Sequence, residues 1–176
     1  GRRQVNGLFV ATYLFPAIVL AIPLFVLFTR MGLRGSLVGL ALVYIAQTVP
    51  VAIYMLRNYF DTIPVSIEES AMMDGLGTMG TLRRITLPLA LPSIMATGLF
   101  VFMIAWNEFL FALLFLVDRR ESWTVSLGLA QLSGSIEVPT TVLMAGSVVI
   151  TLPVIVLFFA TERLLSGGLT AGAEKG

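Results

Sequence analysis

The side chains best equipped for chemistry form a short polar group inside an apolar run. Trp106, Asn107 and Glu108 place an aromatic face, an amide and a carboxylate within the stretch 94–117. An aromatic face can stack on a sugar ring, and the amide and carboxylate can hydrogen-bond to its hydroxyls. A charge deep in a membrane costs at least about 2.5 kcal/mol, so we expect Glu108 to face a cavity or a partner chain. The alternative is an interfacial Trp106 with Glu108 reaching the outer lipid headgroups.

A second polar pair, Gln47 and Thr48, lies just before Pro50 in another apolar run. Proline removes a backbone N–H and kinks a helix, and the carbonyl that it frees needs protein or water as a partner. Two interpretations stay open. The pair lines a solute path beside the kink, or the kink serves packing and the threonine hydroxyl bonds to its own backbone.

Enzymatic chemistry has few residues to work with. The 176 residues include no histidine and no cysteine, which removes the commonest general base, the commonest metal ligand and every thiolate. The run 75–80 matches G-x-G-x-x-G, but a dinucleotide site needs a strand before it, so we interpret it as a flexible turn. No G-x-x-x-x-G-K-[ST] motif occurs, so this chain cannot bind and hydrolyse ATP through a P-loop by itself. We expect no catalytic residue, no metal site and no cofactor in this chain.

Composition predicts an integral membrane protein. Hydrophobic residues make up 57% and charged residues 12%, and the mean hydropathy is +0.96. A helix needs roughly 20 apolar residues to cross a hydrocarbon core of about 30 Å. We predict an all-α fold with four transmembrane helices, at 8–29, 35–56, 94–117 and 142–161. The net charge of +1 says nothing about nucleic acid, and no basic block occurs, so we expect no nucleic-acid partner.

The polar segment 57–93, between the second and third predicted spans, carries helix signals. Ser66 with Glu69 three residues later matches a capping box, in which both side chains satisfy backbone N–H groups of a first turn. Gly75 can take the left-handed conformation that ends a helix. We therefore predict a short helix over 65–74.

This short helix could lie on the membrane or dock into another protein. Its apolar positions form no wide stripe, and its three acids would be repelled by anionic lipid, so we favour docking. Methionine adapts to irregular surfaces, so Met72 and Met73 could fill a groove of the partner. The predicted docking residues are Ser66, Glu68, Glu69, Ala71, Met72, Met73, Asp74 and Gly75. A second short helix is predicted from Thr78, as its N-cap, to a stop at Leu87-Pro88.

The same segment resembles a known motif. The pattern E-A-A, three residues, G, nine residues, I-x-L-P is typical of the inner-membrane permeases of binding-protein-dependent ABC importers. Matching positions are Glu69, Ala71, Gly75, Ile85, Leu87 and Pro88, and Ser70 replaces the first alanine. Three flanking segments are similar to the carbohydrate-uptake, maltose permease-like branch of these permeases. They are R-N-Y-F at 57–60, A-W-N-E-F at 105–109 and the tail 168–176. The resemblance runs over essentially the whole chain.

The resemblance implies a partner set and a mechanism. The helix 65–74 would be the coupling helix that sits in a groove of an ATP-binding subunit, present in two copies. A second homologous permease chain and an extracytoplasmic sugar-binding protein would complete an importer in the inner membrane of a prokaryote. It would move a sugar or short oligosaccharide, trehalose being one candidate, by alternating access. Such permeases have about six spans, so we expect that this sequence lacks the first two.

Alternatives to this interpretation are an importer for a non-sugar solute and an ion-coupled secondary transporter. The latter would need several acids or a histidine relay within the membrane, and Glu108 is the only formal charge in the predicted spans. An intramembrane enzyme would need paired carboxylates, a histidine or a cysteine there.

Charge asymmetry predicts the orientation. With the N-terminus inside, seven basic residues are cytoplasmic and four are outside, which follows the positive-inside rule. The inside set is Arg2, Arg3, Arg57, Arg83, Arg84, Arg163 and Lys175, and the outside set is Arg30, Arg34, Arg119 and Arg120. The segment 57–93 is then cytoplasmic.

The outer loop 118–141 would carry a short helix and either meets the binding protein or is simply solvated. The tail 162–176 reads as a flexible end, but the resemblance implies that it reaches the ATPase interface.

Overall fold

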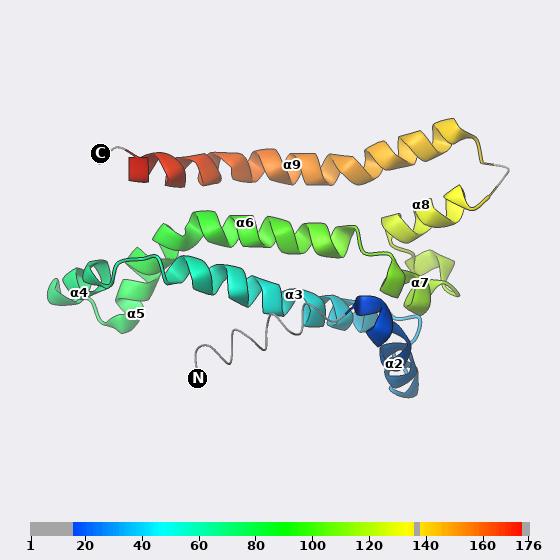
Figure 1. Cartoon of the computed structure of the whole chain (residues 1–176), viewed down its shortest axis with the longest axis horizontal. Coiled ribbons are helices and arrows are strands. Elements are labelled where there is room, and N and C mark those ends of the chain that lie inside the picture. The colour runs from blue at the N-terminus through cyan, green and yellow to red at the C-terminus, as the bar shows by residue number, and fades with distance from the viewer. Residues whose placement is uncertain (1–15, 136–137, 174–176) are drawn as a thin grey trace. The chain divides into compact units, whose positions relative to one another are not determined.

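The computed structural model describes residues 16–135 and 138–173, and every regular element in those ranges is helical (Figure 1). This confirms the all-α class. The elements are α2 (Ala17–Arg30), α3 (Leu37–Phe60), α4 (Val65–Met73), α5 (Thr78–Thr81), a π-helical segment (Leu82–Thr86), α6 (Leu87–Trp106), α7 (Leu110–Leu116), a 3₁₀ turn (Arg120–Ser122), α8 (Val125–Ser133) and α9 (Thr140–Ala173).

Among the described residues, three helices are long and apolar enough to cross a membrane: Leu37–Phe60, Thr78–Trp106 and Thr140–Glu162. The first and last overlap the predicted spans 35–56 and 142–161. A shorter apolar helix, Ile18–Arg30, covers the second half of the predicted span 8–29. Residues 8–15 lie outside the described part of the chain.

The predicted helix stop at Leu87-Pro88 is wrong. Gly77 is the N-cap and Thr78 is the first helical residue, and the helix then runs without interruption to Trp106. Proline has no N–H and its ring clashes with the carbonyl four residues earlier in an α-helix. The five residues Leu82–Thr86 form a π-helical segment directly before Leu87-Pro88, and the Leu87 N–H reaches back to the Leu82 carbonyl. This wider turn carries the helix past the proline.

The predicted continuous helix over 94–117 is also wrong. The apolar run extends to 117, but the helix ends at Trp106 and resumes as the seven-residue α7 after a break at 107–109. Hydropathy alone cannot detect such a break, because both sides of it are apolar. Its cause is a set of hydrogen bonds to Glu108, described below.

The chain divides into two compact units. One comprises the described parts of 1–51 and 102–156, and the other those of 52–101 and 157–176. The buried core of the first unit is Ala21, Leu40, Val43, Phe111, Ala112, Phe115, Leu116 and Leu127. Half of these residues come from α7, so this short helix is the centre of the core. The Phe115 ring meets the rings of Phe25 and Phe28 edge-on, with centroids 6.2 and 5.3 Å apart.

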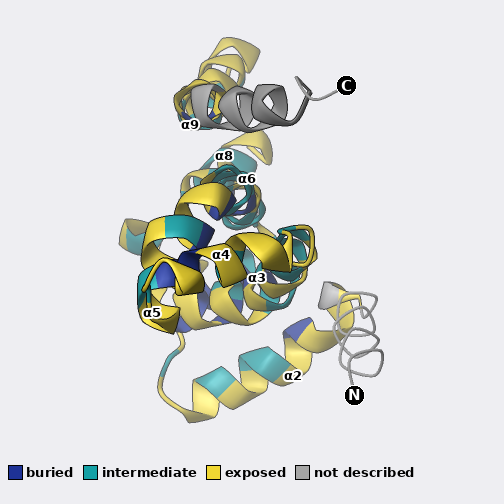
Figure 2. Ribbon diagram, turned by 90° about the vertical axis from the view of Figure 1, so that its left-hand side faces the viewer, coloured by how far each residue is buried: buried dark blue, intermediate teal, exposed yellow. Residues whose placement is uncertain are grey.

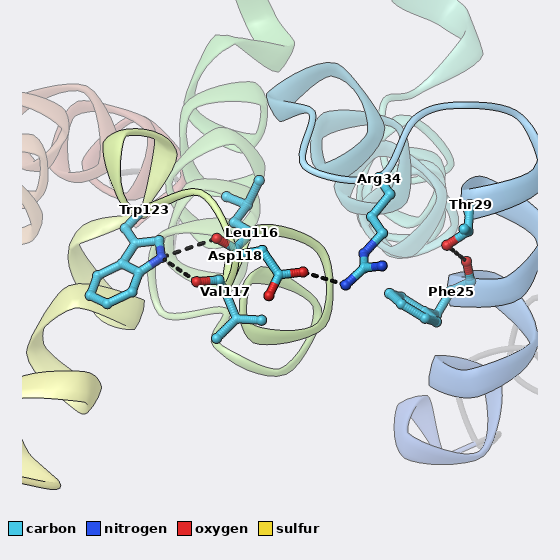
Figure 3. A network of polar contacts seen from close by, with 7 residues as sticks. All are labelled: Phe25, Thr29, Arg34, Leu116, Val117, Asp118 and Trp123. Carbon is cyan, nitrogen blue, oxygen red and sulfur yellow. Dashed lines mark hydrogen bonds and ion pairs between the residues drawn. The ribbon is translucent and has the colours of Figure 1, made fainter.

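The C-terminal carbonyls of α7 are satisfied by neighbouring segments. The Gly35 N–H donates to the Phe115 carbonyl at 2.9 Å. The Trp123 indole N–H donates to the carbonyls of Leu116 and Val117, at 3.0 and 3.3 Å (Figure 3). Nearby, Arg34 forms an ion pair with Asp118, and its guanidinium lies 5.4 Å from the centre of the Phe25 ring. The last turn of α7 therefore leaves no carbonyl of Phe115, Leu116 or Val117 without a donor.

The predicted outer loop 118–141 contains the short helix α8. Thr124 is its N-cap, and the threonine hydroxyl oxygen accepts from the Leu127 N–H at 3.3 Å. Leu127 is fully buried in the core of the first unit. This segment is therefore held by packing and by a cap. Residues 136 and 137 of the loop lie outside the described chain.

Candidate functional site

The predicted docking helix is present as α4, but it begins differently from the prediction. Pro64 is the N-cap, Val65 is the first helical residue, and no side chain caps the helix. The predicted capping box of Ser66 and Glu69 is therefore not formed. Proline pre-sets the extended entry to the helix, so Ser66 falls inside the first turn, where its hydroxyl cannot act as an N-cap.

The end of α4 confirms the prediction for Gly75. Its φ is +90°, in the left-handed region. The Gly75 N–H donates to the Met72 carbonyl and the Leu76 N–H donates to the Ala71 carbonyl, both at 3.1 Å. This pair of bonds is a Schellman motif. A β-carbon on Gly75 would meet nothing within 4 Å, so only the backbone conformation demands glycine here.

The predicted docking residues divide into an inner and an outer group. Ala71 is buried, and the half-buried Glu68 accepts a hydrogen bond from the Thr86 hydroxyl at 3.2 Å. The other six are exposed, and most of α4 has the colour of exposed residues in Figure 2. Met73, with 88% of its surface exposed, is the most exposed large hydrophobic residue in the described part of the chain. Those six are Ser66, Glu69, Met72, Met73, Asp74 and Gly75. The inner pair fixes α4 on its own unit, and the outer group presents methionine and acid to the surroundings.

In the first unit, Glu108 caps the N-terminus of α7. One carboxylate oxygen accepts from the Phe111 N–H at 2.7 Å. The other accepts from the Ala112 N–H at 3.1 Å and from the Tyr44 hydroxyl at 2.9 Å. Helix N-termini carry partial positive charge and unpaired N–H groups, so a carboxylate placed there is stabilised. These three bonds also explain why the chain breaks at 107–109.

Trp106 is used for packing in the same unit. Its indole N–H donates to the Ile150 carbonyl at 2.9 Å, and its own carbonyl accepts from the Ser126 hydroxyl at 2.6 Å. Its ring stacks on Phe102, with centroids 5.3 Å apart.

Thr48, one of the two predicted pathway residues before Pro50, is buried and donates to the Tyr44 carbonyl at 2.7 Å. For Thr48 the structure thus shows the backbone-bonded arrangement, and Gln47 beside it is half-buried.

A cavity of about 350 Å³ lies in the first unit. Of the predicted pathway residues only Asn107 lines it. The other lining residues are Phe109, Ser126, Leu129, Ala130, Ser133, Leu143, Ser147 and Ile150. Sequence reasoning missed the serines. Ser126 and Ser133 are seven residues apart, which places them on one face of α8, and this spacing was the available signal. No spacing in the sequence could have added Ser147 of α9.

Comparison with known proteins gives consistent results over the full length of the chain. The inner membrane ABC transporter permease protein YcjP of Escherichia coli is 40% identical over 176 residues, covering 100% of this chain and 62% of YcjP. The trehalose/maltose transport system permease protein MalG of Thermococcus litoralis is 37% identical, with 100% and 63% covered. The trehalose transport system permease protein SugB of Mycobacterium tuberculosis is 38% identical, with 100% and 65% covered. The chain thus spans less than two thirds of the length of these relatives.

The family described as the binding-protein-dependent transport system inner membrane component matches residues 1–166. That match takes in α4, the cavity and the three helices of the described chain that are long enough to cross a membrane. The chain belongs to this family of inner-membrane transport components.

Proposed function

We propose that this chain is a membrane-spanning, non-catalytic subunit of an ATP-driven importer for a sugar or short oligosaccharide. The single observation that carries the proposal is the match of residues 1–166 to the inner-membrane components of binding-protein-dependent transport systems. The exposed methionine and acid surface of α4 is the feature that such a subunit would use to meet its ATPase.

The proposed partners are those of a binding-protein-dependent importer. Two ATP-binding subunits hold ATP and Mg²⁺, and one of them receives α4 of this chain. A second homologous permease chain completes the solute path, and a sugar-binding protein delivers the solute from outside the cytoplasmic membrane. In this arrangement the segment 57–93 is cytoplasmic, as the distribution of basic residues indicates.

The proposed mechanism is alternating access driven by nucleotide binding. Closure of the ATPase pair moves α4, and the membrane helices change from an inward-open to an outward-open arrangement. Such a shift requires that the ATPase bind α4 differently in the two states, because a ligand with equal affinity for both states changes nothing. The Schellman end of α4 suits this role, since it fixes the helix terminus with bonds inside its own segment.

The sugar class is proposed from the relatives. Two of them are named for trehalose or for trehalose and maltose, and the diacetylchitobiose uptake permease DasC of Streptomyces coelicolor is 34% identical over 177 residues. Trehalose is therefore the first solute to test. An ion-coupled carrier is disfavoured because Glu108 is committed to three hydrogen bonds that hold the α6–α7 break.

The test is uptake by the complete transporter in proteoliposomes. Purified permease chains and ATP-binding subunits are reconstituted with the binding protein outside and ATP inside. We expect uptake of trehalose or maltose that requires both ATP and the binding protein. Uptake that persists without ATP and collapses with an ionophore would identify a secondary transporter instead.

A further inference from the structure

The crevice lined by Asn107 and the three serines has the properties of a small-molecule site. Its walls come from Asn107 and Phe109, which follow the end of α6, from α8 and from the first turns of α9, all within one compact unit. Its volume of about 350 Å³ lies at the lower end of the range of roughly 300–1,000 Å³ for ligand sites. Asn107, Phe109, Ser133 and Ser147 are each exposed, so their side chains are open to a ligand.

Every serine hydroxyl in the crevice has already used its hydrogen. Ser126 donates to the Trp106 carbonyl at 2.6 Å, Ser133 to the Ala130 carbonyl at 2.7 Å and Ser147 to the Leu143 carbonyl at 3.0 Å. A carbonyl can only accept, so the direction of each bond is fixed. A hydroxyl has one hydrogen and two lone pairs. Each serine therefore offers only acceptor lone pairs to a ligand.

Asn107 adds to the same character. One N–H of its amide donates to the Met103 carbonyl at 2.8 Å, which fixes the amide orientation. The amide oxygen has no hydrogen-bond partner among the described residues. The crevice thus presents four acceptor groups and, from the side chains that line it, a single remaining donor, the second Asn107 N–H. Such a wall selects a ligand rich in donors.

The charge and the apolar part of the lining narrow the ligand class. No acidic or basic residue lines the crevice, so a cation would have no counter-charge there. The rest of the wall is Leu129, Ala130, Leu143, Ile150 and the ring of Phe109, which is 39% exposed. A neutral molecule with hydroxyl groups on its rim and C–H groups on one face complements both parts. That description fits a pyranose ring.

We propose that this crevice is a subsite for one ring of a neutral sugar. The sugar hydroxyls donate to Asn107, Ser133 and Ser147, and the ring rests on Phe109. Ser126 is bonded to the Trp106 carbonyl, so it also positions α8 on α6. The inference rests on the proposed import function and deepens it. Trp106 and Glu108 lie outside the subsite, because they do not line the crevice.

The first test is transport kinetics of the reconstituted transporter with the double variant Ser133→Ala/Ser147→Ala. Each change removes acceptor lone pairs and leaves the helix backbone intact. Losing two hydrogen bonds is expected to raise the KM for trehalose or maltose about tenfold. The matched control is Thr151→Val, which removes a hydroxyl bonded to the Ser147 carbonyl on the same helix but outside the crevice. Equal KM values for wild type and double variant would overturn the subsite.

The second test uses the absence of cysteine from the chain. In the whole transporter, Ser147→Cys should react with a small thiol reagent, and trehalose or maltose should slow the reaction. Glycine betaine, which has no hydroxyl donor, should not slow the reaction. Labelling without sugar protection, or no labelling because another chain covers the position, would contradict the proposal. If wild-type transporter takes up sugar while both tests give these negative results, only the subsite fails. If wild type takes up no sugar at all, the import proposal itself fails.

Discussion

Two short helices of this protein, α7 and α4, solve the problem of their unpaired ends in opposite ways. The seven residues of α7 contribute four fully buried side chains. Its N-terminus is bonded by Glu108, which the distant Tyr44 holds in place, and its C-terminus is bonded by Gly35 and Trp123. The nine residues of α4 contribute one buried side chain, Ala71, and its C-terminal end is closed by its own segment. A helix whose side chains are buried and whose two ends are bonded has a structural role. A helix that closes its own end and leaves its side chains exposed is available to a partner.

The contrast has an energetic basis. Inside an apolar environment every backbone group at a helix end must find a partner, and each one left unpaired costs about 1–3 kcal/mol. For α7 the partner at one end is Glu108, which itself accepts from the Tyr44 hydroxyl, and the partners at the other end are Gly35 and Trp123. Water can serve the first turn of α4, so its loss of a capping box costs little.

The largest effect should come from cutting the N-terminal ties of α7. Glu108→Leu leaves the N–H groups of Phe111 and Ala112 and the Tyr44 hydroxyl without their acceptor, at about 1–3 kcal/mol for each group. We expect a clear drop in the Tm of the purified transporter and in its abundance in the membrane. Glu108→Gln keeps one acceptor oxygen and should fall between. The control is Glu69→Leu on exposed α4, and equal Tm values for the two leucine variants would refute the role given to Glu108.

The next effect should separate coupling from folding. Gly75→Val places a β-branched residue at φ +90°, which costs about 1–3 kcal/mol locally. We expect transport to fall strongly while the Tm and the membrane abundance stay near wild type. Gly75→Asn is the matched variant, since asparagine tolerates the left-handed region and nothing lies near the new β-carbon. Normal uptake by the valine variant at normal abundance would show that the end of α4 has no part in coupling.

A smaller effect is expected at the C-terminal end of α7. Trp123→Phe keeps an aromatic ring and removes the indole N–H that serves the carbonyls of Leu116 and Val117. The loss should be about 0.5–1.5 kcal/mol, because the Gly35 and Arg119 N–H groups still serve this end. A thermal melt of the purified transporter measures it. A loss of stability as large as that of Glu108→Leu would mean that the Gly35 and Arg119 N–H groups do not support the C-terminal end of α7 when the indole N–H is absent.

The same contrast explains which features the sequence could predict. The helix α4 and its end were predictable because the signals are local: Gly75 closes a helix through a bond to Met72 and through its own backbone conformation. The long apolar helices were predictable from hydropathy for a similar reason. The break at 107–109 was not, because Glu108 is held in part by Tyr44, 64 residues earlier.

The candidate sugar site shows the same limit. Tryptophan, asparagine and glutamate at 106–108 are the types expected of a sugar site, and only Asn107 lines the crevice. The neighbouring pair turned out to hold α6, α7 and α9 together. Residue type cannot reveal that a donor or acceptor is already occupied, since the occupant comes from another helix.

The most direct test of the central claim concerns Met73, the most exposed large hydrophobic residue of the proposed docking surface. Met73→Cys introduces a single thiol into a chain that has none. In membranes that contain the whole transporter, a short bifunctional thiol reagent should join this position to a cysteine placed in the groove of the ATP-binding subunit, and ATP should change the yield. Phe158→Cys, on the exposed apolar surface of α9, should give no such product. Active transport with no cross-link at Met73 in any nucleotide state would contradict the assignment of α4 as the docking helix.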